Sequence, residues 1–115
     1  MTIIEELASA LKKRKANVVV KARVKGMSGI EHEVDLLVRN GEKYAFVLLN
    51  ECSCENFIKQ FVKTVDLHGY KSYLLVESSC AEKLFESIKP KSTIIYTDEK
   101  DLLSKILSLV ELKQS

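Results

Sequence analysis

The sequence predicts an α/β fold in which a central mixed sheet lies between two layers of helices. Three patterns in its 115 residues indicate this class. Apolar residues recur at helical spacing in some segments and alternate with polar residues in others. The segment Tyr44 to Leu49 is apolar at every position, as expected of a strand that is covered on both faces. Helical and strand patterns alternate in the second half, which is typical of strands joined by crossover helices.

The first half is expected to form one helix and three strands. A helical apolar pattern begins at Ile3 and ends in the basic run Lys12–Lys15. Residues 18–25 alternate between apolar and basic side chains, which predicts a half-exposed strand with a basic outer face. Asn40-Gly41 is a strong hairpin signal, and it separates a second strand at about 30–38 from a third at about 43–50.

The second half is expected to alternate helices with strands. A helix at about 54–68 precedes two strands, at 72–76 and 93–96, and a short helix between these strands stops before Pro90. A last helix spans about 98–112, and its broad apolar face is expected to pack on the sheet, with dimerisation as the alternative. The predicted order is therefore α-β-β-β-α-β-α-β-α, in a single domain of residues 1–115.

Charge is distributed unevenly along the chain. The net charge is +2, but residues 1–30 hold seven basic and two acidic residues, whereas residues 31–115 carry a net charge of −3. A basic first third on an otherwise acidic chain is typical of a surface that binds a polyanion. A solvated helix end and an exposed strand face would give the same pattern. The basic residues concerned are Lys12, Lys13, Arg14, Lys15, Lys21, Arg23 and Lys25.

Composition and hydropathy exclude several classes of protein. Apolar residues make up 46% of the chain and charged residues 30%, which is the composition of a globular protein and not of a disordered one. The longest apolar run is too short to cross a bilayer, and the N-terminal charges follow the apolar residues, the reverse of a secretory signal. We therefore expect a cytoplasmic protein with no membrane partner.

The three cysteines, Cys52, Cys54 and Cys80, are expected to be free thiols. They cannot all pair within one chain, and Cys52 and Cys54 are too close in sequence for a normal structural disulfide. A zinc site made from them and a histidine is a weak match, because zinc prefers four ligands arranged as two spaced pairs.

Residues 26–50 carry a combination of motifs that occurs in a known family. A glycine and serine turn at Gly26–Gly29 is followed by His-Glu-Val-Asp at 32–35, the hairpin residue Gly41 and the strand YAFVLLN. Together with the order of elements, this segment resembles the archaeal branch of the PD-(D/E)XK nuclease superfamily, which includes restriction enzymes and Holliday-junction resolvases. The resemblance implies a restriction-endonuclease-like three-layer α/β/α fold and a nucleic-acid partner, with DNA as the expected type.

The resemblance also implies the position of a metal site. In that family an aspartate of the second strand and a glutamate of the third hold a divalent metal such as Mg²⁺, and a lysine two residues later helps to activate the attacking water. A glutamate of the first helix often completes the site. Asp35 then corresponds to the metal-binding aspartate, and Glu5 or Glu6 to the helix carboxylate. By the same analogy, His32 is placed to contact nucleic acid or to brace the sheet.

The third strand lacks the glutamate and lysine of the family. A three-residue hairpin loop would pair Asp35 with Ala45 and place Val47 and Leu49 where the glutamate and lysine belong. A two-residue loop would pair Asp35 with Phe46, and it offers no carboxylate and lysine either. Asp35 is therefore interpreted as vestigial, and no cofactor is expected.

A relocated site is the alternative that would keep the chain an enzyme. Glu51 follows the third strand, and Glu55 and Lys59 lie one helical turn apart on the next helix. With Asp35 they would rebuild the acidic and basic set of a Mg²⁺-dependent nuclease. A surface ion pair of Glu55 with Lys59 is the simpler interpretation.

Three functions are compatible with these patterns. The leading hypothesis is a non-catalytic protein of nuclease-like fold that binds nucleic acid, or that acts as a scaffold subunit in a nucleic-acid-processing assembly. The first alternative is an active nuclease with the relocated site. The second is a protein-interaction or homodimerisation module, in which the basic residues serve only solubility.

Overall fold

The structure, a computed structural model, describes residues 3–67, 69–84 and 92–111. The elements within these ranges follow one another as α1 (Ile3–Lys13), β1 (Asn17–Lys25), β2 (Glu31–Asn40), β3 (Glu42–Leu48), α2 (Cys54–Asp66), β4 (Lys71–Glu77), α3 (Ser78–Leu84), β5 (Thr93–Tyr96) and α4 (Glu99–Glu111). The predicted α/β class is confirmed. Among the helices of these ranges, none is long and apolar enough to cross a membrane.

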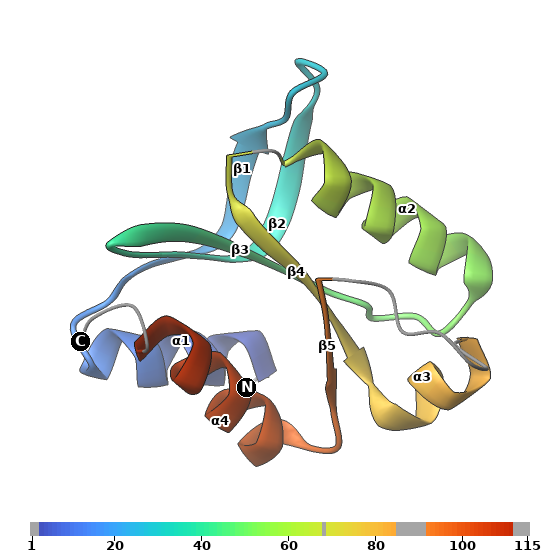
Figure 1. The fold of residues 1–115 in the computed structure, drawn as a ribbon. Helices are drawn as coiled ribbons and strands as arrows, with labels where there is room; N and C mark the ends of the chain where they lie inside the picture. The colour runs from blue at the N-terminus through green and yellow to red at the C-terminus, as the bar shows by residue number, and fades with distance from the viewer. Residues whose placement is uncertain (1–2, 68, 85–91, 112–115) are drawn as a thin grey trace.

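The five strands form one mixed sheet in the order β1-β2-β3-β4-β5. The first three are antiparallel neighbours, whereas β3, β4 and β5 run parallel to one another. In Figure 1, α1 and α4 lie below the sheet, and α2 and α3 lie on the other side. The helices of the two parallel connections, α2 and α3, cover one face of the sheet, and α4, which follows β5, covers the other face together with α1.

Two apolar cores fill the spaces between these layers. The lower core joins α1 and α4 to the sheet through residues such as Leu7, Phe46 and Ile106. The upper core lies under α2 and α3 and includes Val47 and Leu67. Residues 44–47 of β3 are fully buried, which confirms the prediction that this strand is covered on both faces.

β1 changes from one core to the other at Lys21. Its apolar side chains are largely buried and its basic ones exposed, as the alternation predicts. However, Val18 belongs to the lower core, whereas Ala22 and Val24 belong to the upper one. Lys21 lies between them with a φ of 53°, a left-handed conformation that is uncommon for a residue other than glycine. Figure 1 shows the β1–β2 hairpin turning away from the rest of the sheet.

Both predicted registers of the β2–β3 hairpin are wrong. Leu36 pairs with Phe46, and the pairing continues through to Asn40 with Glu42, so Gly41 alone remains between the paired residues. Gly41 has a φ of 80°, and this left-handed conformation allows the tighter turn. The shift is by two residues relative to the three-residue loop. Because side chains alternate between the two faces of a strand, a shift of two residues changes the partners but not the face on which each side chain lies. Leu37 therefore lies on the same face as Ala45, as the three-residue loop predicts.

The last helix packs on the sheet, as expected. Leu102, Ile106 and Val110 of α4 are buried in the lower core. The exposed apolar helix face lies on α2 instead, where Ile58 and Val62 keep 59% and 56% of their surface exposed. The expected dimerisation through α4 stays a prediction.

The left-handed backbone at Lys21 leads to a prediction about stability. A β-branched side chain is poorly tolerated in this conformation, so Lys21→Val should lower the free energy of unfolding by about 1–2 kcal/mol. Urea denaturation followed by circular dichroism measures it. Lys25→Val is the matched control, because Lys25 lies on the same strand without a positive φ. Equal losses in the two variants would contradict the prediction.

Candidate functional site

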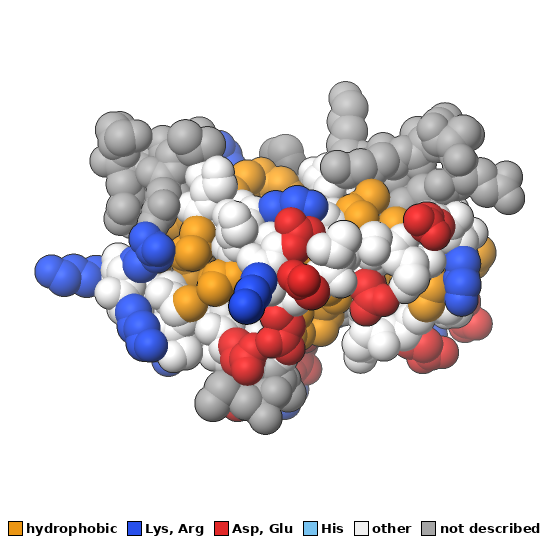
Figure 2. Space-filling model, turned by 90° about the horizontal axis from the view of Figure 1, so that it is seen from below, with side chains coloured by type: hydrophobic (Ala, Val, Ile, Leu, Met, Phe, Trp, Pro, Cys, Tyr) orange, Lys and Arg blue, Asp and Glu red, His pale blue; other side chains and the backbone are white. Residues whose placement is uncertain are grey.

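The seven basic residues singled out in the sequence are all exposed. Four of them follow one another at the C-terminal end of α1, and three project from β1, which is an edge strand of the sheet. Figure 2, which views the molecule from the side of α1 and α4, shows Lys and Arg side chains gathered at the left end and Asp and Glu side chains across the middle. The basic residues therefore line one end and one edge of the fold.

The structure adds two basic residues that the sequence reasoning missed. Asn17, Arg39 and Lys43 lie side by side on β1, β2 and β3, and all three are exposed. They sit at the end of the sheet where β1 leaves the basic end of α1. The sequence places both residues beside the hairpin, but their direct pairing follows only from the observed register, which neither predicted loop gives.

The direct opposition of Arg39 and Lys43 has an electrostatic consequence. Like charges facing each other across two antiparallel strands destabilise the pairing. An anion between the two side chains would offset this repulsion. We call the seven basic residues together with Arg39 and Lys43 the basic edge. Within it Arg23 has an acidic neighbour, Glu31, at 3.3 Å between Nη1 and Oε1, and this pair is exposed.

Asp35 is satisfied by the backbone and not by a catalytic partner. Its Oδ2 atom accepts a hydrogen bond of 2.7 Å from the backbone N–H of Leu48. Val47 and Leu49, the residues that the resemblance aligns with a glutamate and a lysine, are buried, at 0% and 8% exposure. These two apolar side chains supply neither a metal ligand nor a basic group.

The relocated set is not brought together. Glu55 and Lys59 form an exposed pair on α2, 3.7 Å apart between Oε1 and Nζ, which matches the simpler interpretation. Across residues 3–67, 69–84 and 92–111, no three acidic, histidine or cysteine side chains lie close enough to hold a metal ion. Glu51 and Asp35 therefore do not join Glu55 in such a group, and Glu5 and Glu6 do not complete one with Asp35.

The Gly-Ser turn of the motif closes around Asp66 at the end of α2, a residue that the sequence reasoning did not single out. The Asp66 carboxylate accepts hydrogen bonds from the backbone N–H and the hydroxyl of Ser28, at 2.9 and 2.7 Å. The Nε2 atom of His32 lies 2.6 Å from Oδ2 of the same carboxylate. These contacts fasten the β1–β2 turn to α2, so His32 braces this junction, and its contact with nucleic acid stays a prediction.

Gly26 is required by the same junction. A Cβ atom at this position would lie 2.1 Å from Oδ2 of Asp66 and 2.9 Å from its backbone oxygen. Any side chain would therefore push the turn away from α2. Gly26 and His32 therefore both lie against Asp66.

The hydrogen bonds to Asp66 also change its acidity. The Ser28 hydroxyl, the His32 ring and the Ser28 amide all stabilise the charged form and lower the pKa of the Asp66 carboxyl group below its usual value. A carboxyl group whose pKa is lowered by folding stabilises the protein above its unfolded pKa. The contribution is lost as the pH falls through the lowered value.

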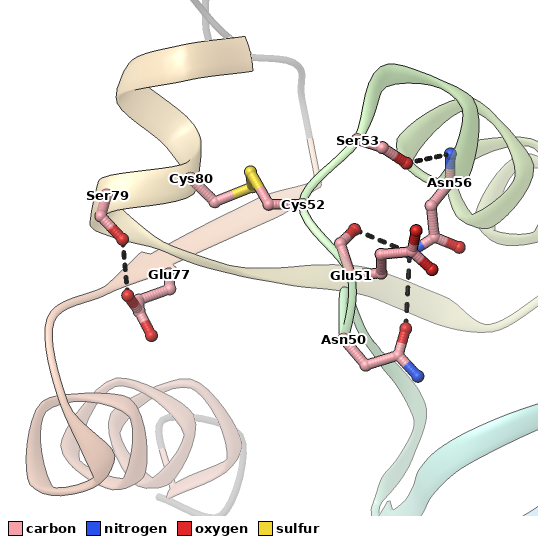
Figure 3. The surroundings of a disulfide bond; sticks show 8 residues. All are labelled: Asn50, Glu51, Cys52, Ser53, Asn56, Glu77, Ser79 and Cys80. Carbon is pink, nitrogen blue, oxygen red and sulfur yellow. Dashed lines mark hydrogen bonds between the residues drawn. A yellow bond between two sulfur atoms is a disulfide. The ribbon is translucent and has the colours of Figure 1, made fainter.

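The prediction that the cysteines are free thiols is wrong for two of them. Cys52 and Cys80 form a disulfide, and Cys54 keeps an exposed free thiol. Figure 3 shows the bond joining the segment before α2 to the start of α3. The two cysteines follow the parallel neighbours β3 and β4, so the sheet brings together residues that are 28 positions apart. A loop of this length corresponds to a stabilisation of about 3–4 kcal/mol.

The chain is similar in structure to one protein of undetermined role. No protein-family model matches the sequence, and no curated protein matches it either. A crystal structure of a protein of unknown function, AF1548, aligns with a TM-score of 0.50 and 14% sequence identity over 94% of this chain. The chain spans 66% of the length of that protein. At this identity the similarity concerns the fold alone.

The lowered pKa of Asp66 should make the thermal stability of the protein depend on pH in the acidic range. Folding lowers the pKa of Asp66, so wild-type protein should lose thermal stability as the pH falls from the ordinary aspartate pKa of about 4 through this lowered value. Asp66→Asn should melt at a lower temperature than wild type at pH 7, and the difference should narrow on acidification. Thermal unfolding followed by circular dichroism from pH 7 to pH 3 measures both effects. Glu55→Gln, at an exposed position, is the control, and a constant difference across this range would argue against the assignment.

Proposed function

We propose that the chain is a nucleic-acid-binding protein of nuclease-like fold in which the metal-dependent site is vestigial. The observation that carries this proposal is the basic edge, where the seven predicted side chains are exposed and Arg39 and Lys43 extend the set onto two further strands. The charges lie along one end and one edge of the sheet, so an extended polyanion can follow them.

Phosphate contacts explain why this arrangement suits nucleic acid. A duplex presents a regular row of phosphate charges, and basic side chains that neutralise them release condensed counterions. Such contacts position a protein on the backbone and carry no sequence information. We therefore expect affinity that depends strongly on salt and little on sequence. The repulsion between Arg39 and Lys43 would be relieved on binding.

The resemblance to the PD-(D/E)XK superfamily supports DNA as the partner and a restriction-endonuclease-like assignment of the fold. The motif residues occupy the antiparallel part of a mixed sheet flanked by helices on both faces. The apolar residues Val47 and Leu49 support the loss of activity. A protein of this kind would bind DNA without cutting it, or would serve as a scaffold subunit of a nuclease complex.

Charge reversal tests the proposal. The test variant carries Glu at three positions of the basic edge, namely Lys13, Lys25 and Arg39. Its affinity for a fluorescent DNA duplex, measured by anisotropy, should fall at every salt concentration, and the slope of log affinity against log salt should decrease by about three. The matched control carries Glu at three exposed lysines elsewhere, namely Lys59, Lys83 and Lys100.

Two outcomes would contradict the proposal. Absence of binding at low salt, or equal losses in the test and control variants, would remove the basic edge as an interface. Cleavage of the duplex in Mg²⁺ that disappears in Asp35→Ala would instead establish the relocated nuclease, with Glu51, Glu55 and Lys59 as its next candidates. The basic edge would then serve substrate binding.

The exposed face of α2 favours a second function, homodimerisation. Ile58, Val62 and Val65 keep 59%, 56% and 64% of their surface exposed. They are spaced by four and then three residues, as in the seam of a helix that packs against another helix. Between two antiparallel copies of α2, Val62 would meet its own counterpart and Ile58 would meet Val65.

Sedimentation velocity tests the dimer. Val62→Lys should shift the chain to monomer over a concentration range in which the wild type self-associates, because it would place two charges at the centre of the seam. Val19→Lys is the control, since Val19 is an exposed apolar residue of β1. Monomeric wild type at high protein concentration would exclude this function.

A further inference from the structure

A crevice lies at the carboxyl ends of the three parallel strands. It has a volume of about 340 Å³ and is lined by Leu48 at the end of β3 with the two residues that follow it, by Glu77 at the end of β4, and by Tyr96 at the end of β5. In open α/β sheets, ligands bind in the crevice outside the carboxyl ends of the parallel strands. This crevice belongs to none of the features described above for nucleic-acid binding or dimerisation.

The Cys52–Cys80 disulfide forms part of the wall of the crevice. Cys52 is exposed, whereas Cys80 is 8% exposed. Both cysteines line the crevice, and Cys52 is the more exposed residue of the pair, so we expect a thiol to attack the bond at Cys52. Exposed disulfides are the ones that exchange with thiols most readily.

Polar groups around the disulfide favour its cleavage in one direction. Lys83 also lines the crevice, and it lies three residues after Cys80 on α3, so the two residues share one face of this helix. A nearby cation stabilises a departing thiolate. The acidic neighbour Glu77 accepts a hydrogen bond from the Ser79 hydroxyl at 2.6 Å (Figure 3). Burial and the charge of Glu77 raise the pKa of Tyr96, whose hydroxyl thus stays protonated as a hydrogen-bond donor.

We propose that this crevice is a thiol–disulfide exchange site, in which a thiol compound attacks Cys52 and releases Cys80. The incoming thiolate forms a bond to Sγ of Cys52 as the bond between Cys52 and Cys80 breaks. Cys80 leaves as a thiolate beside Lys83 and then takes a proton from solvent. A second thiol attacks the outer sulfur of the mixed disulfide, which leaves Cys52 reduced. Two external thiols thus give two electrons to the protein and depart as one disulfide.

Reduction would release two segments that the bond now ties together. Cys52 immediately precedes Ser53, whose Oγ atom accepts a hydrogen bond of 3.1 Å from the backbone N–H of Asn56 and caps α2. On the other side, α3 buries only Cys80 and Ala81 among its described residues. Reduction of the disulfide would therefore loosen α3 and widen the crevice. The two apolar cores would remain packed.

Exchange in the folded protein is the test. The oxidised full-length chain is incubated with glutathione, a small monothiol, or with a purified protein dithiol reductant, and free thiols are alkylated and counted by intact mass. Folded wild type should change from one labelled thiol to three. Cys54→Ser should change from none to two, because its remaining cysteines are the bonded pair. The glutathione adduct should map to Cys52 by peptide mass spectrometry.

Lys83→Gln provides a second measurement. It should slow the exchange at neutral pH by roughly two- to fivefold, the effect of one exposed charge pair. Lys100→Gln on α4, outside the lining of the crevice, should exchange at the wild-type rate. Reduction of the folded protein by either reagent supports the exchange site. The reagent that reduces the bond shows whether the site accepts a small thiol or a protein dithiol. Reduction only where circular dichroism shows unfolding, or an adduct confined to Cys80, would overturn the proposal.

Discussion

β3 lies in the middle of the sheet, and both of its faces are closed by apolar cores. Residues 44–47 are fully buried, with Phe46 facing the helices α1 and α4 and Val47 facing α2 and α3. Every other element is placed by the need to cover this strand: β2 and β4 pair with it, and the four helices divide between its two sides. Apolar burial of this kind is the main favourable term in folding, so the architecture depends on it.

The same burial decides where charge can lie. Val47 and Leu49, at the positions where the resemblance would place a carboxylate and a lysine, lie inside the upper core. Charges are instead displaced to the edge strand β1, the end of α1 and the β2–β3 hairpin. The central strand is occupied by packing, and both the basic edge and the crevice lie at the margins of the sheet.

Side-chain contacts between distant segments hold these margins in place. Asp66 joins the end of α2 to the β1–β2 turn through Ser28 and His32, and Gly26 permits the close approach. The Cys52–Cys80 bond joins the segment before α2 to α3. A specific contact therefore holds each end of α2, and Phe57 and Phe61 pack against the upper core between them, although Thr64 is the only described residue of the helix in the buried class.

The sequence by itself determined the elements of the fold, because helix and strand periodicity are local properties of the chain. The alternation at β1, the Asn40-Gly41 hairpin and the apolar run of β3 all identified their elements correctly. Tertiary structure alone decided the hairpin register, the disulfide and the role of Asp66. Register depends on the turn conformation at Gly41, and the other two on residues that parallel pairing and helix docking bring together. Such contacts leave no periodic signal in the sequence, because their partners are set by the three-dimensional path of the chain.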